Sequence, residues 1–404
     1  MNILFLTTGL FDSIEQHGIY TDLLRTFRNS GHQVYSVSSL ERRIGRKTEY
    51  KEDNGTYALR VKIGNLTKCG IIEKGCSTLL IEHQYKKAIK KYIGQVKFDL
   101  VMYSTPPITL EKVIAYIKKR DNAKTYLLLK DIFPQNAVDI GMMKKGGLTG
   151  VLYHYFRRKE KQLYAISDRI GCMSPANVDY LLKHNPEIPA AKVEVCPNSF
   201  EVRDMSITKE ERNRFRERYE IPLDKKVFVY GGNLGKPQGI PFIIECLKTQ
   251  MSNQDAYFLI VGDGTEYGKL YAFFEKFPSG NMKLMQGLPK EDYDRMVAAC
   301  DVGLIFLDHR FTIPNFPSRL LSYMQAKLPV LCCTDPNTDV GQVCVDGGFG
   351  WWCESNDTAA FDNCVEQALH SDLTQMGEKG YIYLNEHYNV AKAANIIMDG
   401  LFIK

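Results

Sequence analysis

Short runs of β-branched, aliphatic and aromatic residues alternate with longer amphipathic stretches through the whole chain, and this alternation constrains the fold more than any other feature. In the first half, six such runs are predicted to be strands, at residues 3–6, 34–37, 100–103, 125–129, 169–173 and 193–196. Strands that alternate with helices form parallel sheets covered by helices on both faces. The pattern therefore predicts an α/β fold with a doubly wound, Rossmann-like sheet.

After residue 200 a charged, polar stretch interrupts the pattern, and the alternation then begins again. The second series of predicted strands covers residues 227–230, 257–261, 302–306 and 329–333. A chain of 404 residues is long enough for two domains. We therefore expect two doubly wound Rossmann-like domains, 1–200 and 201–385, that face each other across a cleft. A closing helix within 386–404 is expected to cross back to the N-terminal domain.

The net charge indicates which classes of binding partner are expected, and the cysteine content indicates the cellular compartment. The chain has 52 Lys and Arg against 47 Asp and Glu, a formal net charge of +5, which is too small for a nucleic-acid coat but suits an anionic ligand or membrane surface. Its 11 cysteines are scattered, without Cys-x-x-Cys spacing, which favours a reducing cytosol and does not support a zinc site. No run approaches the about 18 apolar residues of a membrane-spanning helix. We expect a cytoplasmic protein with no nucleic-acid partner.

Polar residues follow two predicted strands of the first domain, and ligands of doubly wound sheets bind at such carboxyl ends. Gly9 follows the first strand, and His17-Gly18 precede the next predicted helix, where free backbone N–H groups favour an anion; an ordinary glycine turn is the alternative. Lys130 and Asp131 follow the strand at 125–129. Asp131 is a candidate contact for a sugar hydroxyl or a developing positive centre, and its alternative role is that of a helix N-cap.

A glycine-rich loop follows the first strand of the second domain. Glycines let a ligand approach the backbone closely, and Lys236 supplies a charge for phosphate oxygens; a glycine turn with a solvated lysine is the alternative. The spacing is not that of a Walker loop. The next strand ends in Gly-Asp-Gly at 262–264, but the strand predicted at 283–286 does not end in an acidic residue, so a dinucleotide-binding fingerprint is not supported. The glycine-rich loop after the strand predicted at 227–230 has the sequence Gly231-Gly232-Asn233-Leu234-Gly235-Lys236-Pro237-Gln238-Gly239.

Two further segments contain groups that are typical of phosphate chemistry. Asp292 and Asp294 form an Asp-x-Asp string, which can hold a divalent ion on a diphosphate; acids also suit the start of a helix, and we favour that interpretation here. Pro317-Ser318-Arg319 begin a predicted helix, and a helix start with a hydroxyl and a guanidinium is a good phosphate seat. An ordinary surface arginine is the alternative.

Taken together, these segments resemble the retaining glycosyltransferases of family 4, which have the two-domain GT-B fold, and in particular the bacterial surface-polysaccharide members. The resemblance covers nearly the whole chain, and it rests on the order and spacing of individually weak matches. These matches lie at residues 32–37, 131–138, 173–175, 195–198, 232–239, 261–264, 299–304 and 317–319.

The resemblance assigns candidate roles in both domains. It implies catalytic roles for Asp131, Lys236 and Arg319. The implied donor-binding residues are Gly231, Gly232, Asn233, Lys236, Gln238, Gly262, Asp263, Gly264, Leu288, Pro317, Ser318, Arg319 and Ser322. The implied acceptor side consists of Gly9, His17, Gly18, Lys130 and Asp131. In one departure, Pro314 and Ser322 stand where the family commonly has two glutamates, so the usual ribose-binding carboxylate is absent.

The resemblance also implies a reaction. A metal-independent hexosyltransferase without a cofactor would move a sugar from a nucleotide diphosphate sugar, above all a UDP-sugar, with retention at the anomeric carbon. The acceptor would be a hydroxyl of a polyprenyl diphosphate-linked saccharide in capsule, O-antigen, lipopolysaccharide or exopolysaccharide synthesis. Two alternatives stay open: a nucleotide-sugar epimerase or hydrolase on the same fold, and an inactive member, suggested by the missing glutamates, that acts as a partner protein.

Two basic and aromatic stretches, at residues 83–92 and 151–164, bear on location. Such residues on one helix suit an anionic membrane interface, and a solvated charged helix face explains them equally well. With a lipid-linked acceptor, we expect the protein to be cytoplasmic and peripheral on the inner face of the plasma membrane.

Overall fold

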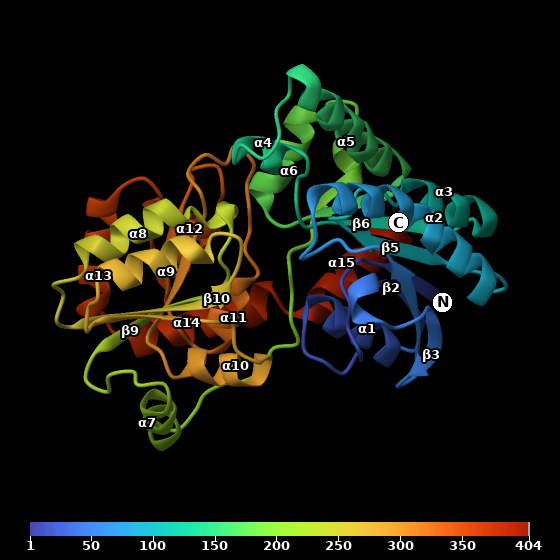
Figure 1. Ribbon diagram of the computed structural model, residues 1–404. Helices are drawn as coiled ribbons and strands as arrows, with labels where there is room; N and C mark the ends of the chain where they lie inside the picture. The colour runs from blue at the N-terminus through green and yellow to red at the C-terminus, as the bar shows by residue number, and fades with distance from the viewer. Residues whose placement is uncertain (403–404) are drawn as a thin grey trace. The chain divides into compact units, whose positions relative to one another are not determined.

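The computed structural model describes residues 1–402, and the side chains of these residues apart from positions 71, 72, 148 and 149. Contacts between residues divide the chain into two compact units (Figure 1). The first unit contains Met1–Glu201 and the segment from Asn389 onward, and the second unit contains Val202–Tyr388.

The first unit is built on an eight-stranded sheet with the order β3-β4-β2-β1-β5-β6-β7-β8. All neighbouring strands are parallel except β3 and β4, which are antiparallel. The strands are β1 (Asn2–Leu6), β2 (Gln33–Glu41), β3 (Glu49–Asp53), β4 (Thr56–Ile63), β5 (Leu100–Ser104), β6 (Lys124–Leu129), β7 (Arg169–Cys172) and β8 (Val193–Val195).

Helices cover this sheet, and the last helix of the chain packs into the same core. Ala393 and Ile397 of α15 belong to one buried apolar cluster with Ile3 and Phe5 of β1 and with Phe27 of α1, so α15 stabilises the first unit. The helices of this unit are α1 (Ile19–Asn29), α2 (Ile71–Tyr92), α3 (Glu111–Asp121), α4 (Gln135–Asp139), α5 (Gly147–Ile166), α6 (Pro175–His184) and α15 (Val390–Phe402), with the short 3₁₀ turns η1 (Arg42–Ile44) and η2 (Ala190–Lys192).

The second unit contains a six-stranded parallel sheet with the order β11-β10-β9-β12-β13-β14. Its strands are β9 (Lys226–Asn233), β10 (Ala256–Asp263), β11 (Met282–Met285), β12 (Val302–Phe306), β13 (Val330–Thr334) and β14 (Gly350–Glu354). Its helices are α7 (Lys209–Arg218), α8 (Ile240–Thr249), α9 (Tyr267–Lys276), α10 (Lys290–Ala298), α11 (Arg319–Gln325), α12 (Val340–Asp346), α13 (Thr358–Leu369) and α14 (Leu373–His387), with the 3₁₀ turn η3 (Lys236–Gln238).

The predicted fold class of two parallel-sheet, Rossmann-like domains is confirmed, and every predicted strand is present. The alternation pattern missed β3, β4 and β14, which lie at or next to the sheet edges. β3 and β4 form a hairpin whose turn residues Asn54 and Gly55 both have positive φ, 48° and 74°, as a tight two-residue turn requires. The edge strands β3 and β14 bury only part of their side chains, so their apolar signal is weak. β4, by contrast, is mostly buried. None of the described helices is both long and apolar enough to span a bilayer.

Candidate functional site

The carboxyl ends of β9 and β10 form the centre of the candidate site in the second unit. The two strands pair in parallel, with Gly231 opposite Val261, Gly232 opposite Gly262, and Asn233 opposite Asp263. Two glycine turns therefore leave the same edge of the sheet side by side. In open α/β sheets this edge is where ligands bind.

Close packing explains three of the predicted donor-binding glycines. A Cβ atom at Gly231 would lie 2.0 Å from the hydroxyl oxygen of Tyr293, one at Gly262 would lie 1.8 Å from the carbonyl oxygen of Gly232, and one at Gly264 would lie 2.3 Å from that of Leu234. Backbone atoms exclude a side chain at Gly262 and Gly264, and a side chain at Gly231 would force the Tyr293 ring to move. The protein's own packing therefore favours glycine at all three positions, whether or not a ligand binds.

Gly232 differs from these glycines because its Cβ position faces a cation. Its φ is +128°, and a Cβ atom there would lie 2.6 Å from Nη2 of Arg319. Its bare backbone therefore leaves open access to the guanidinium group.

Arg319 is held by aromatic residues rather than by carboxylates. Its guanidinium carbon lies 4.1 Å from the ring centroid of Tyr230, within the range of a cation–π contact. Burial lowers the pKa of Arg319, but the hydroxyls of Tyr230, Tyr323 and Tyr293 raise it, and the net pKa is above the usual value. Arg319 forms no ion pair within the described part of the chain, so its charge is available for an anion.

Lys236 begins η3, directly after the glycine turn, and its side chain is exposed. Gln238 fixes this turn, since its Oε1 accepts hydrogen bonds from Gly235 N at 3.1 Å and from Asn233 Nδ2 at 3.3 Å. Pro237 is tied to the end of β12 by a hydrogen bond from Asp308 N to its carbonyl, at 2.9 Å. Like Arg319, Lys236 has no carboxylate partner among the described residues.

Asp263 links the β10 turn to the loop that contains Leu288. Gly287 N donates a hydrogen bond to Asp263 Oδ2 at 3.3 Å. The structure therefore brings Leu288 close to the carboxyl end of β10, which the sequence spacing alone did not require.

The predicted phosphate seat at the start of α11 stays a prediction. α11 has seven residues, and Ser318 at its N-cap has helical φ and ψ values and makes no capping bond with its side chain. Such a short helix contributes little dipole. Of the four residues predicted here, only Arg319 carries a charge; Pro317, Ser318 and Ser322 do not.

The Asp-x-Asp string lies on α10, as the helix interpretation predicted. Asp294 accepts from Lys290 at 2.7 and 2.8 Å, and Asp292 lies 3.6 Å from Arg218. Both carboxylates therefore face cations of the protein itself.

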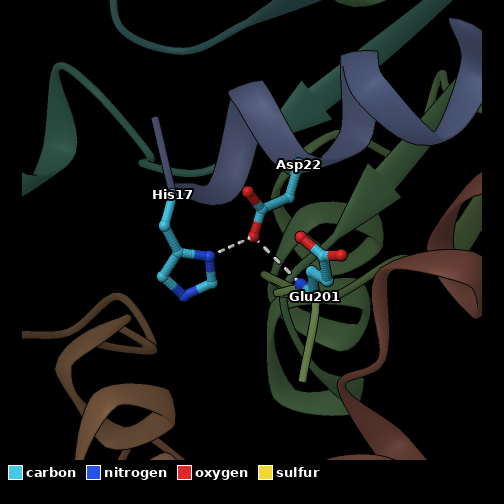
Figure 2. A group of neighbouring side chains, drawn as sticks. All are labelled: His17, Asp22 and Glu201. Atoms are coloured by element: carbon cyan, nitrogen blue, oxygen red, sulfur yellow. Dashed lines mark hydrogen bonds and ion pairs between the residues drawn. The ribbon is translucent and has the colours of Figure 1, made fainter. Parts of the chain in front are cut away.

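In the first unit, His17 is oriented by a carboxylate that the sequence analysis missed. Nδ1 of His17 lies 2.7 Å from Oδ2 of the buried Asp22, as Figure 2 shows. Asp22 also accepts from the backbone N–H groups of Gly18, at 3.1 Å, and of Glu201, at 2.9 Å. Burial raises the pKa of Asp22, but these hydrogen bonds outweigh it, and the net pKa is below the usual value. An ionised Asp22 keeps the proton of neutral His17 on Nδ1 and makes Nε2 a hydrogen-bond acceptor.

Ligand atoms of His17, Asp22 and Glu201 lie within 4.8 Å of one another, which raises the question of a metal site. Nη2 of Arg25 lies 2.5 Å from Asp22 and 2.7 Å from Glu201. A guanidinium group already neutralises both carboxylates, so a metal ion would have to displace it. The arrangement suits a fixed imidazole better than a metal centre. Asp22 could have been identified in the sequence only by its position in the first turn of the helix that follows His17.

Lys130 and Asp131 lie at the carboxyl end of β6, as predicted. The hydroxyl oxygen of Thr105 accepts from the backbone N–H groups of both residues, at 3.1 and 3.2 Å, and Asn136 Nδ2 lies 2.8 Å from both carboxylate oxygens of Asp131. Burial lowers the pKa of Lys130 to about 8 and raises that of Asp131 to about 6. The alternative role of Asp131 as N-cap is wrong, because Pro134 caps α4.

We expect Asp131→Asn to stabilise the protein near pH 7.5. The folded-state pKa of about 6 exceeds the unfolded value of about 3.9. The folded state therefore binds the carboxyl proton of Asp131 more tightly than the unfolded state does. The stability that this proton contributes is fully present below pH about 4 and is lost as the pH rises through 6. Removing the buried charge should add about 1–3 kcal/mol at pH 7.5. Urea unfolding at pH 7.5 and 4.5 checks this; an equal gain at both pH values would contradict it.

Part of the second unit matches a known family of proteins. Residues 211–382, which include every candidate donor residue, match the family model described as "Glycosyl transferases group 1". The chain is 25% identical to the probable glycosyltransferase WbjE of Pseudomonas aeruginosa over 293 residues. This aligned region is 72% of this chain and 71% of that protein. The chain is 22% identical over 254 residues to the putative colanic acid biosynthesis glycosyl transferase WcaI of Escherichia coli K12, over 61% and 60% of the two chains.

A solved structure extends the similarity to the whole fold. HepE from Anabaena, crystallised in complex with UDP, is similar with a TM-score of 0.69 over 99% of both chains, at 12% identity. These findings confirm the predicted resemblance to glycosyltransferases with the GT-B fold. The finer assignment to family 4 stays a prediction.

Proposed function

We propose that the protein transfers a sugar from a UDP-sugar, with retention at the anomeric carbon, to a hydroxyl of a lipid-linked saccharide. The match of residues 211–382 to the family model of the group 1 glycosyl transferases supports a glycosyl transfer. The observation that supports this most is a pair of cations near the carboxyl end of β9: Lys236 follows the strand, and Arg319 begins α11 and lies against Gly232. Neither has a carboxylate partner among the described residues, and exposed Gly232 lies against Arg319. A diphosphate is the anion that such a pair suits.

The proposed chemistry relies on stabilising the leaving group. As the bond from the anomeric carbon to the phosphate oxygen breaks, negative charge grows on the diphosphate, and Lys236 and Arg319 offset it without a metal or another cofactor. A phosphate oxygen of the leaving group accepts the proton of the acceptor hydroxyl, so no base from the protein is required. We assign contact with the transferred sugar and the acceptor to Asp131, Lys130 and His17.

The relatives suggest the pathway and the donor. WcaI is described as a colanic acid biosynthesis enzyme, and HepE was crystallised with UDP. We therefore place the proposed reaction in surface-polysaccharide synthesis, with a hexose as the transferred sugar and a polyprenyl diphosphate-linked saccharide as the acceptor.

A thermal-shift panel of UDP-, GDP- and dTDP-sugars tests the donor assignment. We expect a UDP-sugar to raise Tm, since a ligand that binds only the folded state stabilises it, and we expect Lys236→Ala to remove most of the shift. Lys290→Ala is the matched control, because that lysine pairs with Asp294 on the surface of the same unit. No shift with any member of the panel would contradict the proposal, and turnover of donor without acceptor would instead indicate an epimerase or hydrolase.

We further propose that the start of α5 contacts an anionic membrane. Met142, Val151 and Leu152 are 62%, 73% and 50% exposed, and exposed apolar side chains beside cations suit a lipid interface. The stretch 83–92 is less suitable, because Tyr85 is fully buried and donates to Thr7 O at 2.7 Å. The exposed cations just before α5 are Lys144 and Lys145.

The double variant Val151→Glu/Leu152→Glu should lose membrane binding. We expect at least about a tenfold drop in the fraction that floats with phosphatidylglycerol-containing vesicles, because burial of two apolar side chains is lost and two repelled charges are added. Leu223→Glu, at an exposed apolar position of the second unit, should float like the wild type. Equal flotation of all three proteins, or indifference to lipid charge, would argue against this surface.

A further inference from the structure

A small cavity of about 150 Å³ lies among α4, α5 and α6 of the first unit. One wall is formed by Ile132 and Gln135, which follow Asp131 almost directly in the chain. Tyr153, Tyr180 and His184 line the remainder together with Lys145 and Arg157. The cavity is smaller than the roughly 300 Å³ of the smallest usual ligand sites, so it suits one ring rather than a nucleotide or an oligosaccharide.

Two tyrosines give this cavity both apolar faces and hydrogen-bonding groups. The Tyr180 ring stacks on His184 with centroids 4.0 Å apart, and Lys145 Nζ lies 5.7 Å from the Tyr153 centroid. Burial raises the pKa of Tyr180 to about 12 and also raises that of Tyr153, so both hydroxyls stay protonated at neutral pH. Neither hydroxyl has a hydrogen-bond partner within the described residues, so both can bond to solvent or to a ligand.

The charged groups of the lining form a fixed wall. Arg157 donates to Glu160 at 2.5 Å, to Asn185 Oδ1 at 2.6 Å and to the carbonyl of His184 at 3.1 Å. Glu160 also accepts from Tyr164 at 2.7 Å. A buried ion pair of this kind costs desolvation energy unless its hydrogen bonds are complete. The network therefore holds α5 and α6 at a defined separation and leaves the tyrosine hydroxyls and Lys145 to meet a ligand.

We propose that this cavity binds one sugar ring of the saccharide acceptor. A sugar ring offers apolar C–H faces to aromatic rings and hydroxyls to neighbouring O–H and N–H groups, which is the combination that Tyr153, Tyr180 and Lys145 present. The wall that follows Asp131 connects the cavity by sequence to the strand end where we place the transferred sugar. The inference rests on the proposed glycosyl transfer, and it assigns the acceptor a subsite separate from the donor residues of the second unit.

Ligand-observed NMR tests the subsite in the intact protein. The probes are the methyl glycosides of glucose, galactose, N-acetylglucosamine and glucuronic acid, and saturation transfer to the ring protons of at least one is expected. In Tyr153→Phe/Tyr180→Phe the rings remain and only two hydroxyls are lost, which should weaken that glycoside about tenfold. Tyr271→Phe, at an exposed tyrosine of α9, is the matched control and should bind as the wild type does.

Each outcome decides the question. No transfer to any glycoside, or equal affinity of the double variant and the wild type, overturns the subsite. If inorganic pyrophosphate displaces the glycoside from the double variant as well as it does from the wild type, the cavity is an anion site of Lys145. That result also overturns the subsite.

Donor binding is measured separately. If UDP still stabilises the double variant, failure of the glycosides concerns the acceptor subsite alone. If UDP-sugars stabilise neither protein, the proposed glycosyl transfer fails, whatever the glycosides show.

Discussion

Arg319→Ala should lower kcat/KM for glycosyl transfer by about 10²–10³-fold, the effect typical of removing one group that stabilises a developing anion. The guanidinium stacks on Tyr230 and forms no ion pair with any described residue. Its removal therefore takes positive charge from the leaving diphosphate without breaking an ion pair of the protein. Initial rates with a UDP-sugar at several concentrations measure the change.

Two variants control this result. Arg319→Lys keeps the charge but loses the planar fork, and should recover only part of the rate. Arg218→Ala removes an arginine whose side chain is 60% exposed and lies 3.6 Å from Asp292, and should leave the rate unchanged. An unchanged rate in Arg319→Ala, with Tm preserved, would show that Arg319 does not contact the leaving group.

Gly232→Ala should abolish most donor binding although it adds only one methyl group. The new Cβ would lie 2.6 Å from Arg319 Nη2, and φ at this position is +128°, a conformation that alanine adopts only at a cost of about 1–3 kcal/mol. The backbone or the guanidinium must shift, and either shift disturbs the proposed diphosphate seat. We expect the UDP-dependent rise in Tm to fall nearly to zero and Tm itself to drop by a few degrees.

Gly268→Ala is the matched substitution. Gly268 lies in α9, and a Cβ atom there has no neighbour within 4 Å, so alanine should leave UDP binding intact and stabilise the helix by up to about 1 kcal/mol. If Gly232→Ala bound UDP as well as Gly268→Ala does, the close approach of backbone and guanidinium would have no role in donor binding.

Much of the candidate site was predictable because its residues follow strands. Lys130, Asp131, Gly232 and Lys236 directly follow apolar runs that are recognisable from local composition, and the ends of parallel strands are where ligands bind. Asp22 was not predicted, because an acid in the first turn of a helix is ordinary and its contact with His17 depends on how the loop folds back. The cavity lined by Tyr153 and Tyr180 was not predicted either, since three separate helices form it.

The fold class and the sheet edges where chemistry was expected could be predicted from the order of the amino acids, because periodicity and glycine turns are local properties of the chain. Long-range packing was needed to establish which glycines serve packing and which one faces Arg319, why Asp131 has a raised pKa, and which carboxylate orients His17. Those properties depend on atoms distant in sequence that burial brings within a few ångströms, and no local pattern encodes such distances.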